Sequence, residues 1–120
     1  MQRFTDLKVW QRSHALVLRI YPITRTFPAD ERFGLTSQLR RAAMSVPSNI
    51  AEGSKRKSKA DFAHFLNVAE GSSAETEYLA MLARDLGYVT EQVAQPLLDE
   101  IEEISRMLWG LRNKVEHADA

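Results

Sequence analysis

Residues 97–115, LLDEIEEISRMLWGLRNKV, decide the fold class of this 120-residue chain. Apolar residues recur in this stretch at intervals of four and three, at Leu97, Ile101, Ile104, Leu108, Leu111 and Val115. Such spacing places them along one face of an α-helix, with charged residues on the opposite face. No part of the chain shows the strict alternation of a half-buried strand, so the fold is predicted to be all-α.

Three more helices are predicted upstream of this one. The first begins at Thr5 or Asp6 and faces the core with the stripe Leu7, Trp10, His14, Val17 and Tyr21, widened by Leu16 and Ile20. The second follows a loop at residues 29–34 and buries Leu35, Leu39, Ala42 or Ala43, Val46 and Ile50. Pro47 interrupts its last turns, and Gly53 is expected to end it.

The third helix begins with the cap Ser58, which has an acid at Asp61, and Gly87 closes it. Its predicted seam is Phe62, Phe65, Ala69, Ser72, Thr76, Leu79, Ala83 and Leu86. The small residues 71–74 favour a close approach to Ala42 and Ala43 of the second helix. The fourth helix begins near Thr90, with a bend or a late start at Pro96. Together these patterns predict one domain, residues 1–120, folded as an antiparallel up-down-up-down four-helix bundle.

The composition excludes several classes of protein. The chain has no cysteine, which rules out disulfides, thiolate metal sites and a cysteine nucleophile. No apolar run approaches the ~20 residues of a membrane span, and no signal peptide is visible at the start. A cytoplasmic protein without membrane contact is therefore expected. Asp61 and His64 have the acid-x-x-His spacing of di-iron bundles, but no second pair exists, so neither a metal nor a cofactor is predicted.

Charge is unevenly distributed along the chain. Residues 1–60 hold 12 Lys and Arg against 4 Asp and Glu, and residues 61–120 hold 4 against 12. The predicted topology gathers cations at one end of the bundle, namely Arg3, Lys8, Arg12, Lys55, Arg56, Lys57, Lys59, Arg112 and Lys114. With Trp10 and Trp109 nearby, this end could bind phosphates and stack bases. It could equally be a solvated loop, with both tryptophans and a hydrogen-bonded His14 in the core.

One short pattern suggests catalysis. Arg112 and His117, separated by four residues on the last helix, resemble the motif of HEPN ribonucleases. In that family the pair is understood to cleave RNA at a dimer interface. A chance match beside the C-terminus explains the pattern better.

A broader resemblance rests on the second helix and its flanks. The residues that carry it are Phe33-Gly34-Leu35, Gln38-Leu39-Arg40-Arg41-Ala42-Ala43, Ser45-Val46-Pro47 and Asn49-Ile50-Ala51-Glu52-Gly53, with Phe4-x-Asp6-Leu7-x-Val9-Trp10 and Phe27-Pro28 before them and Phe62-x-x-Phe65-Leu66, Ala69-x-Gly71-Ser72 and Leu86-Gly87-Tyr88 after them. From about Phe4 to about Leu98 the chain resembles the bacterial four-helix-bundle proteins encoded in intervening sequences of 23S ribosomal RNA genes. It is similar, more distantly, to the accessory variability determinant of diversity-generating retroelements.

This resemblance implies a cytoplasmic homopentamer with a central channel. The retroelement relatives bind nucleic acid and a reverse transcriptase through basic surfaces. The polar and turn residues that match are Arg40, Arg41, Asn49, Glu52 and Gly53. They either bind a ligand or have a structural role, in which Asn49 and Glu52 satisfy the backbone around Pro47. Ser73 and Thr76 replace leucines that the family usually has. The middle of the third helix could therefore pack against the second helix or against a neighbouring subunit.

The sequence thus predicts a non-catalytic, homo-oligomeric bundle, pentameric by resemblance, that binds RNA or DNA. The residues expected to contact phosphate are Arg40, Arg41, Lys55, Arg56, Lys57 and Lys59. The basic and acidic halves could also pair subunits head to tail in a ring. The alternative function is a structural or protein-docking ring, in which the same cations make subunit contacts.

Overall fold

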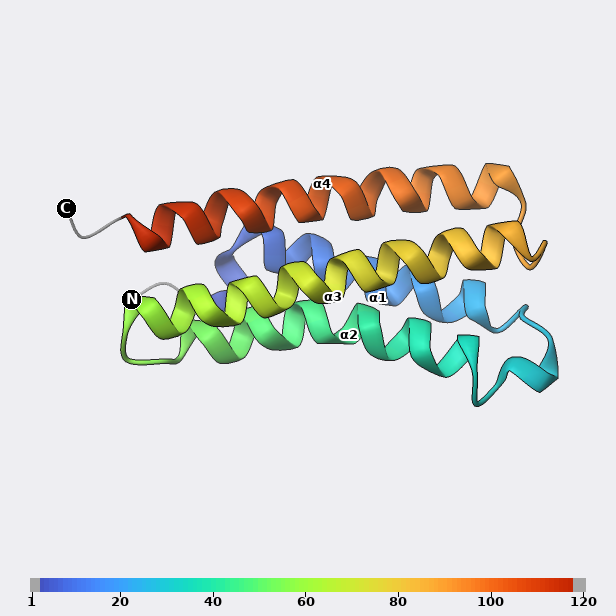
Figure 1. Cartoon of the computed structure of the whole chain (residues 1–120), viewed down its shortest axis with the longest axis horizontal. Coiled ribbons are helices and arrows are strands. Elements are labelled where there is room, and N and C mark those ends of the chain that lie inside the picture. Colours follow the sequence, from blue (N-terminus) through green and yellow to red (C-terminus); the bar gives the residue numbers. More distant parts are fainter. Residues whose placement is uncertain (1–2, 118–120) are drawn as a thin grey trace.

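The computed structural model describes residues 3–117, which form an elongated four-helix bundle of 50 × 23 × 20 Å. The helices are α1 (Lys8–Thr24), α2 (Leu35–Ser54), α3 (Lys59–Asp85) and α4 (Glu91–Glu116). Two short 3₁₀ helices, η1 (Phe4–Asp6) and η2 (Ala29–Glu31), precede α1 and α2. Successive helices run in opposite directions (Figure 1), so the predicted up-down-up-down topology is confirmed.

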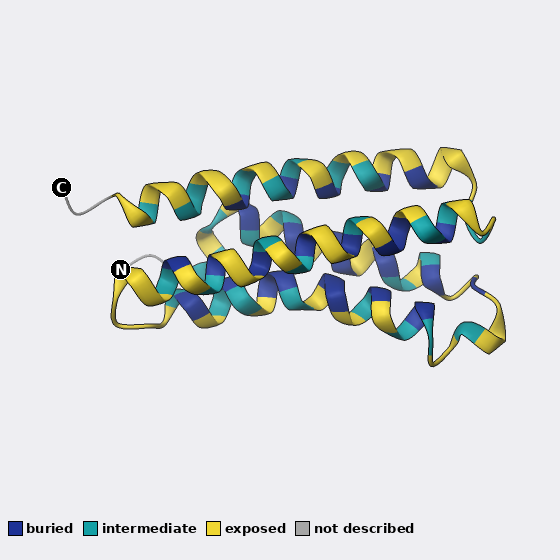
Figure 2. Ribbon diagram, in the orientation of Figure 1, coloured by how far each residue is buried: buried dark blue, intermediate teal, exposed yellow. Residues whose placement is uncertain are grey.

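Helix α3 lies at the centre of the packing. It contacts both α2 and α4 along its length, whereas α1 packs mainly on α2 and has a smaller contact with α4. Each of the four helices has buried positions along its length (Figure 2), and the large side chains that are almost completely buried are Ile20, Leu39, Ile50, Leu66, Ile101, Ile104 and Leu108. Because α3 serves two neighbours, its buried face is wider than the single predicted seam and includes Ala63, Leu66 and Ser73.

Three helix ends, two on α3 and one on α4, follow the predicted capping signals. The Ser58 side chain accepts a hydrogen bond from the Asp61 backbone N–H at 3.0 Å, and Thr90 accepts one from Val93. Gly87, at φ +80°, ends α3 in the left-handed conformation that glycine adopts without strain. Helix α4 begins at Glu91, so a late start at Pro96 is wrong.

Helix α1 differs from its prediction in both start and orientation. It begins at Lys8, after the separate turn η1. Its buried residues are Val9, Ser13, Leu16, Val17, Ile20 and Thr24. His14 is exposed and stacks on Trp10, so the prediction of a core histidine is wrong. The hydroxyls of Ser13 and Thr24 can be buried because each bonds a carbonyl of its own helix.

Two glycines have roles other than those predicted. Gly53 does not end α2, which continues through Ser54. A Cβ at Gly53 would lie 2.7 Å from the Cβ of Phe65 and 3.1 Å from Phe62 Cδ1, so glycine is needed here for the approach of α2 to α3. A Cβ at Gly71 would meet nothing within 4 Å, so Gly71 itself takes no part in the close approach predicted for residues 71–74.

Serine pairs join the helices at the small-residue middle of α3. The hydroxyls of Ser72 and Ser45 lie 2.8 Å apart across α2 and α3, and those of Ser73 and Ser105 lie 2.6 Å apart across α3 and α4. Ser73 is buried, so its hydroxyl needs such a partner. The middle of α3 therefore packs against α2 and α4 of the same subunit. Serine hydrogen bonds contribute to both contacts, in the segment where the family usually has leucines.

Candidate nucleic-acid interface

The loop between α2 and α3, together with the first residue of α3, carries the densest group of cations in the described part of the chain. Lys55, Arg56, Lys57 and Lys59 are all exposed, at the end of the bundle where α4 also ends (Figure 1). Arg56 is engaged locally: its guanidinium lies 2.6 Å from Glu52 and 4.8 Å from the centre of the Phe65 ring. We call Lys55, Lys57 and Lys59 the lysine loop. None of these three lysines forms an ion pair with another residue between 3 and 117.

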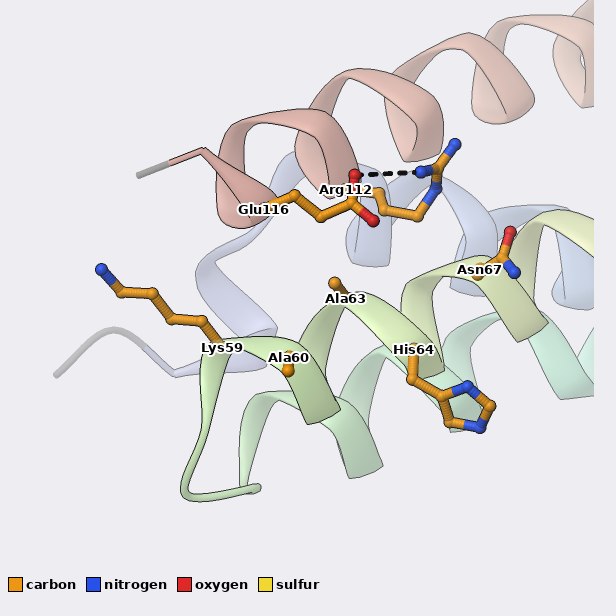
Figure 3. A pocket seen from close by; sticks show the side chains of 7 residues that line it. All are labelled: Lys59, Ala60, Ala63, His64, Asn67, Arg112 and Glu116. Carbon is orange, nitrogen blue, oxygen red and sulfur yellow. Dashed lines mark hydrogen bonds and ion pairs between the residues drawn. The ribbon is translucent and has the colours of Figure 1, made fainter. Parts of the chain in front are cut away.

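A cleft of about 560 Å³ lies beside this loop, between the start of α3 and the end of α4 (Figure 3). It is lined by Lys59, Ala60, Ala63, His64, Asn67, Arg112 and Glu116. The Arg112 guanidinium bonds Glu70 through Nε and Nη2 and Glu116 through Nη1. The hydrogen bond with Glu70 is the main cause of a raised Arg112 pKa. Because two carboxylates offset Arg112, Lys59 is the cation of this cleft available to a ligand.

Within one subunit, Arg112 and His117 have different surroundings. Residues five positions apart lie about 140° from each other around a helix. Arg112 is directed to α3 by Glu70, whereas His117 is exposed and its Nδ1 lies 2.8 Å from the Asn113 carbonyl oxygen. His64, the other histidine near this end, is exposed and its ring points away from Arg112 (Figure 3). Among the described residues, no group of three His, Asp or Glu could hold a metal ion.

Arg40 and Arg41 lie apart from the lysine loop. From residue 41 to residue 55 along α2 the separation is about 21 Å. Arg40 is partly buried against α1, where its Nε donates to Thr24 Oγ1 at 2.8 Å and its guanidinium lies 4.5 Å from the Tyr21 ring centre. Arg41 is exposed. Of the two arginines, Arg41 is therefore the one that can meet a ligand.

The remaining residues of the family motif make contacts within the bundle. Asn49 Nδ2 donates to the Ser45 carbonyl at 2.7 Å and to its hydroxyl at 2.9 Å, and that hydroxyl also bonds Ser72. Glu52 pairs with Arg56, and Gly53 admits the phenyl rings of α3. These contacts fix the end of α2 on α3, and so hold the lysine loop in place.

An outer groove between α1 and α2 was not predicted. One part, of about 380 Å³, is lined by Phe4, Trp10, His14, Val17, Met44, Pro47, Ser48 and Ala51. The next part, of about 290 Å³, is lined by Tyr21, Arg32, Phe33, Thr36, Ser37, Arg40, Arg41 and Met44. Met44 borders both, so the two parts lie next to each other. The sequence contained a signal for this groove, because the apolar residues of α1 extend around more of the helix than the face that packs on the core.

The fold and these contacts define a class of protein: an all-α four-helix bundle with a cationic loop at one end. The model of the 23S rRNA-intervening sequence protein family matches residues 5–110, and the chain belongs to this family. It is similar to the crystal structure of a protein with unknown function from the S23 ribosomal protein family of Bacteroides thetaiotaomicron VPI-5482. The two share 27% identity with a TM-score of 0.80, over 87% of this chain and 97% of the other.

A search of curated proteins found no match to the sequence. The more distant resemblance to the accessory variability determinant stays a prediction. In residues 3–117, no helix is both long and apolar enough to cross a membrane.

Proposed function

We propose that this protein is a non-catalytic accessory factor that binds RNA through the phosphate backbone. The observation that carries the proposal is the contrast between the cations at one end of the bundle. Arg12, Arg56 and Arg112 pair with carboxylates of the bundle, whereas the three residues of the lysine loop are exposed and form no ion pair with another described residue. Unpaired lysines on a loop supply point charges that neutralise phosphates and release counterions.

We further propose that the protein acts as a cytoplasmic homo-oligomer, with five subunits and a reverse transcriptase or other protein as a further partner, as the family resemblance implies. Charge supports self-association, because Arg41 on α2 and Lys55 directly after α2 are exposed cations, whereas α3 and α4 expose Glu75, Asp99 and Glu102. A head-to-tail contact between such faces closes into a ring when the rotation per subunit allows it.

A structural or protein-docking ring remains the second candidate function. The observation that favours it is a set of exposed large apolar side chains on α3, the turn after it and α4, comprising Val68, Tyr78, Met81, Leu86, Val93 and Trp109. Apolar surface of this kind is typical of protein contacts. In that case the lysines would serve subunit or partner contacts.

Fluorescence anisotropy with a labelled single-stranded RNA, measured across salt concentrations, tests the proposal. Binding should weaken linearly in log K against log salt, with a slope of about −0.7 for each phosphate neutralised. Changing Lys55, Lys57 and Lys59 together to alanine should reduce both affinity and slope, whereas the matched change to arginine should preserve them.

Light scattering on the same variants separates the two candidate functions. An oligomer that persists in the alanine variant, together with lost RNA binding, supports the proposal. Loss of the oligomer would instead favour the docking ring. Absence of RNA binding by the wild-type protein at low salt would overturn the proposal.

A further inference from the structure

The outer groove between α1 and α2 combines an aromatic stack with cations. Trp10 and His14 are stacked, with ring centres 5.0 Å apart and planes within 11°, and Phe4 meets Trp10 edge-on at 5.2 Å. Trp10 also packs on the core, whereas His14 is exposed. The stack therefore begins at a partly buried indole ring packed against the core and ends at an exposed imidazole ring.

The lysine loop follows the groove along the direction of α2. Ser48, Ala51 and Lys55 follow one another at intervals of three and four residues on α2 and its C-terminal cap, so they share one face of the helix. Ser48 and Ala51 line the groove, and Lys55 belongs to the lysine loop one turn further on. At the other end, beyond Met44, the groove is lined by Arg32, Arg40 and Arg41.

The charge along this groove has one sign. The two sets of lining residues contain three arginines and no aspartate or glutamate among the described residues. Arg40 is already engaged by Thr24 and Tyr21, which leaves Arg32 and Arg41 exposed at that end. A ligand that spans the groove thus meets cations at both ends and an apolar, aromatic surface between them. A polyanion with flat apolar groups at intervals matches this order of charge and apolar surface.

We infer that this groove holds an unpaired base of a single-stranded RNA whose phosphates are bound by the lysine loop. The base lies on the exposed face of His14 and extends the Trp10–His14 stack, with Met44 and Ala51 as the apolar wall and the Ser48 hydroxyl available to a base edge. Single-strand binding proteins combine a cationic track with aromatic stacking in this way. The inference rests on the proposed function, and it adds a preference for single strands over duplexes, whose bases are already stacked.

The test compares a short labelled single-stranded RNA with a strand of equal length in which the bases are replaced by abasic sites. Both strands carry the same phosphates, so any difference in affinity belongs to the bases. The variants are His14→Ala, which removes the stacking face, and His14→Phe, which keeps a planar ring. Leu18→Ala is the control, since it removes an exposed large apolar side chain from α1 that does not line the groove.

The wild-type protein should bind the intact strand more tightly than the abasic one. His14→Ala should weaken binding of the intact strand about five- to tenfold, the low end of base–aromatic stacking, and leave the abasic strand unaffected. His14→Phe should restore the affinity, and Leu18→Ala should not change it. Circular dichroism melting curves verify that each variant is folded.

Three results would overturn the inference, and they are distinguishable from one another. Equal affinity for both strands, with His14→Ala unchanged, would reject the base site and leave the proposed phosphate contact intact. A change of oligomer mass in His14→Ala, measured by light scattering without a change in RNA binding, would assign the groove to a second copy of the chain. No binding of either strand would reject the proposed function and the inference together.

Discussion

Replacement of Gly53 by alanine would insert a methyl group where α2 meets α3. The new Cβ would lie 2.7 Å from the Cβ of Phe65, an atom fixed to the backbone, and 3.1 Å from Phe62 Cδ1. Since a Cβ cannot swing aside, the two helices must move apart near the lysine loop. Overpacking of this kind costs about 1–3 kcal/mol.

The cost is offset in part by backbone entropy. Glycine within a helix is about 0.5–1 kcal/mol less favourable than alanine, and Gly53 lies inside α2. We therefore expect Gly53→Ala to lower the free energy of unfolding by about 1–2 kcal/mol, a fall in Tm of roughly 4–8 °C for a domain of this size. Urea unfolding followed by far-UV circular dichroism, at one fixed protein concentration, measures this difference through the transition midpoint.

Gly71→Ala is the matched control for this measurement. Gly71 lies in the middle of α3, and a Cβ there would meet nothing within 4 Å. The same chemical change should therefore raise the free energy of unfolding by about 0.5–1 kcal/mol. If Gly53→Ala were as stable as the wild-type protein while Gly71→Ala gained stability, the close approach of α2 to α3 at Gly53 would be refuted.

Three further predictions concern the loops and the serine pairs. Gly87→Ala should lower the free energy of unfolding in urea by about 1–2 kcal/mol because φ is +80°, and Gly87→Asn should lower it less. Equal stability of the wild-type protein and both variants would contradict this prediction. Ser105→Ala should lower the free energy of unfolding by about 1 kcal/mol, because it leaves the buried Ser73 hydroxyl without its partner. The Ser73→Ala/Ser105→Ala double variant should lose less stability than the sum of the two single variants. Strict additivity in this double-mutant cycle would argue against the pair. Hydrogen bonds from the Leu35 N–H and the Tyr88 hydroxyl lower the Glu31 pKa, so this carboxylate stabilises the fold at neutral pH and the contribution is lost as pH falls below about 4.5. The hydrogen bond to Glu31 also raises the Tyr88 pKa, so the stability that this bond contributes is lost above about pH 10. Glu31→Gln should therefore flatten both the acid and the alkaline limb of the stability–pH curve. An unchanged curve would contradict the role given to this hydrogen bond.

The sequence predicted the helices well because capping and periodicity are local signals. The Ser58 and Thr90 side chains cap the helices that follow them, and the backbone freedom of Gly87 ends the helix before it. Each signal therefore acts within a few residues of its own position. The orientation of α1 was not predictable in this way. Its apolar residues cover two adjacent faces, and the choice between them depends on α2 and α4, which bury Ser13 and Thr24 and leave His14 exposed.

The candidate site was predictable only in part, for a related reason. The cations of the α2–α3 loop are adjacent in sequence, and the topology places them at one end. Which cations are neutralised depends on partners far along the chain, such as Glu70 for Arg112 and Glu100 for Arg12. The groove between α1 and α2 likewise joins residues that no single helix pattern brings together.

The arginines and lysines at this end of the bundle make different contacts, and this difference limits what the site can recognise. Guanidinium groups form forked, weakly hydrated contacts, and here Arg12, Arg56 and Arg112 use them within the bundle. Lysine ammonium groups are strongly hydrated point charges that bind phosphate without fixing its orientation. A surface built from the lysine loop alone would therefore bind any nucleic acid backbone in a salt-dependent manner. Discrimination between single-stranded and duplex RNA must then come from a contact with the base, and the exposed face of His14 is the surface that can supply it.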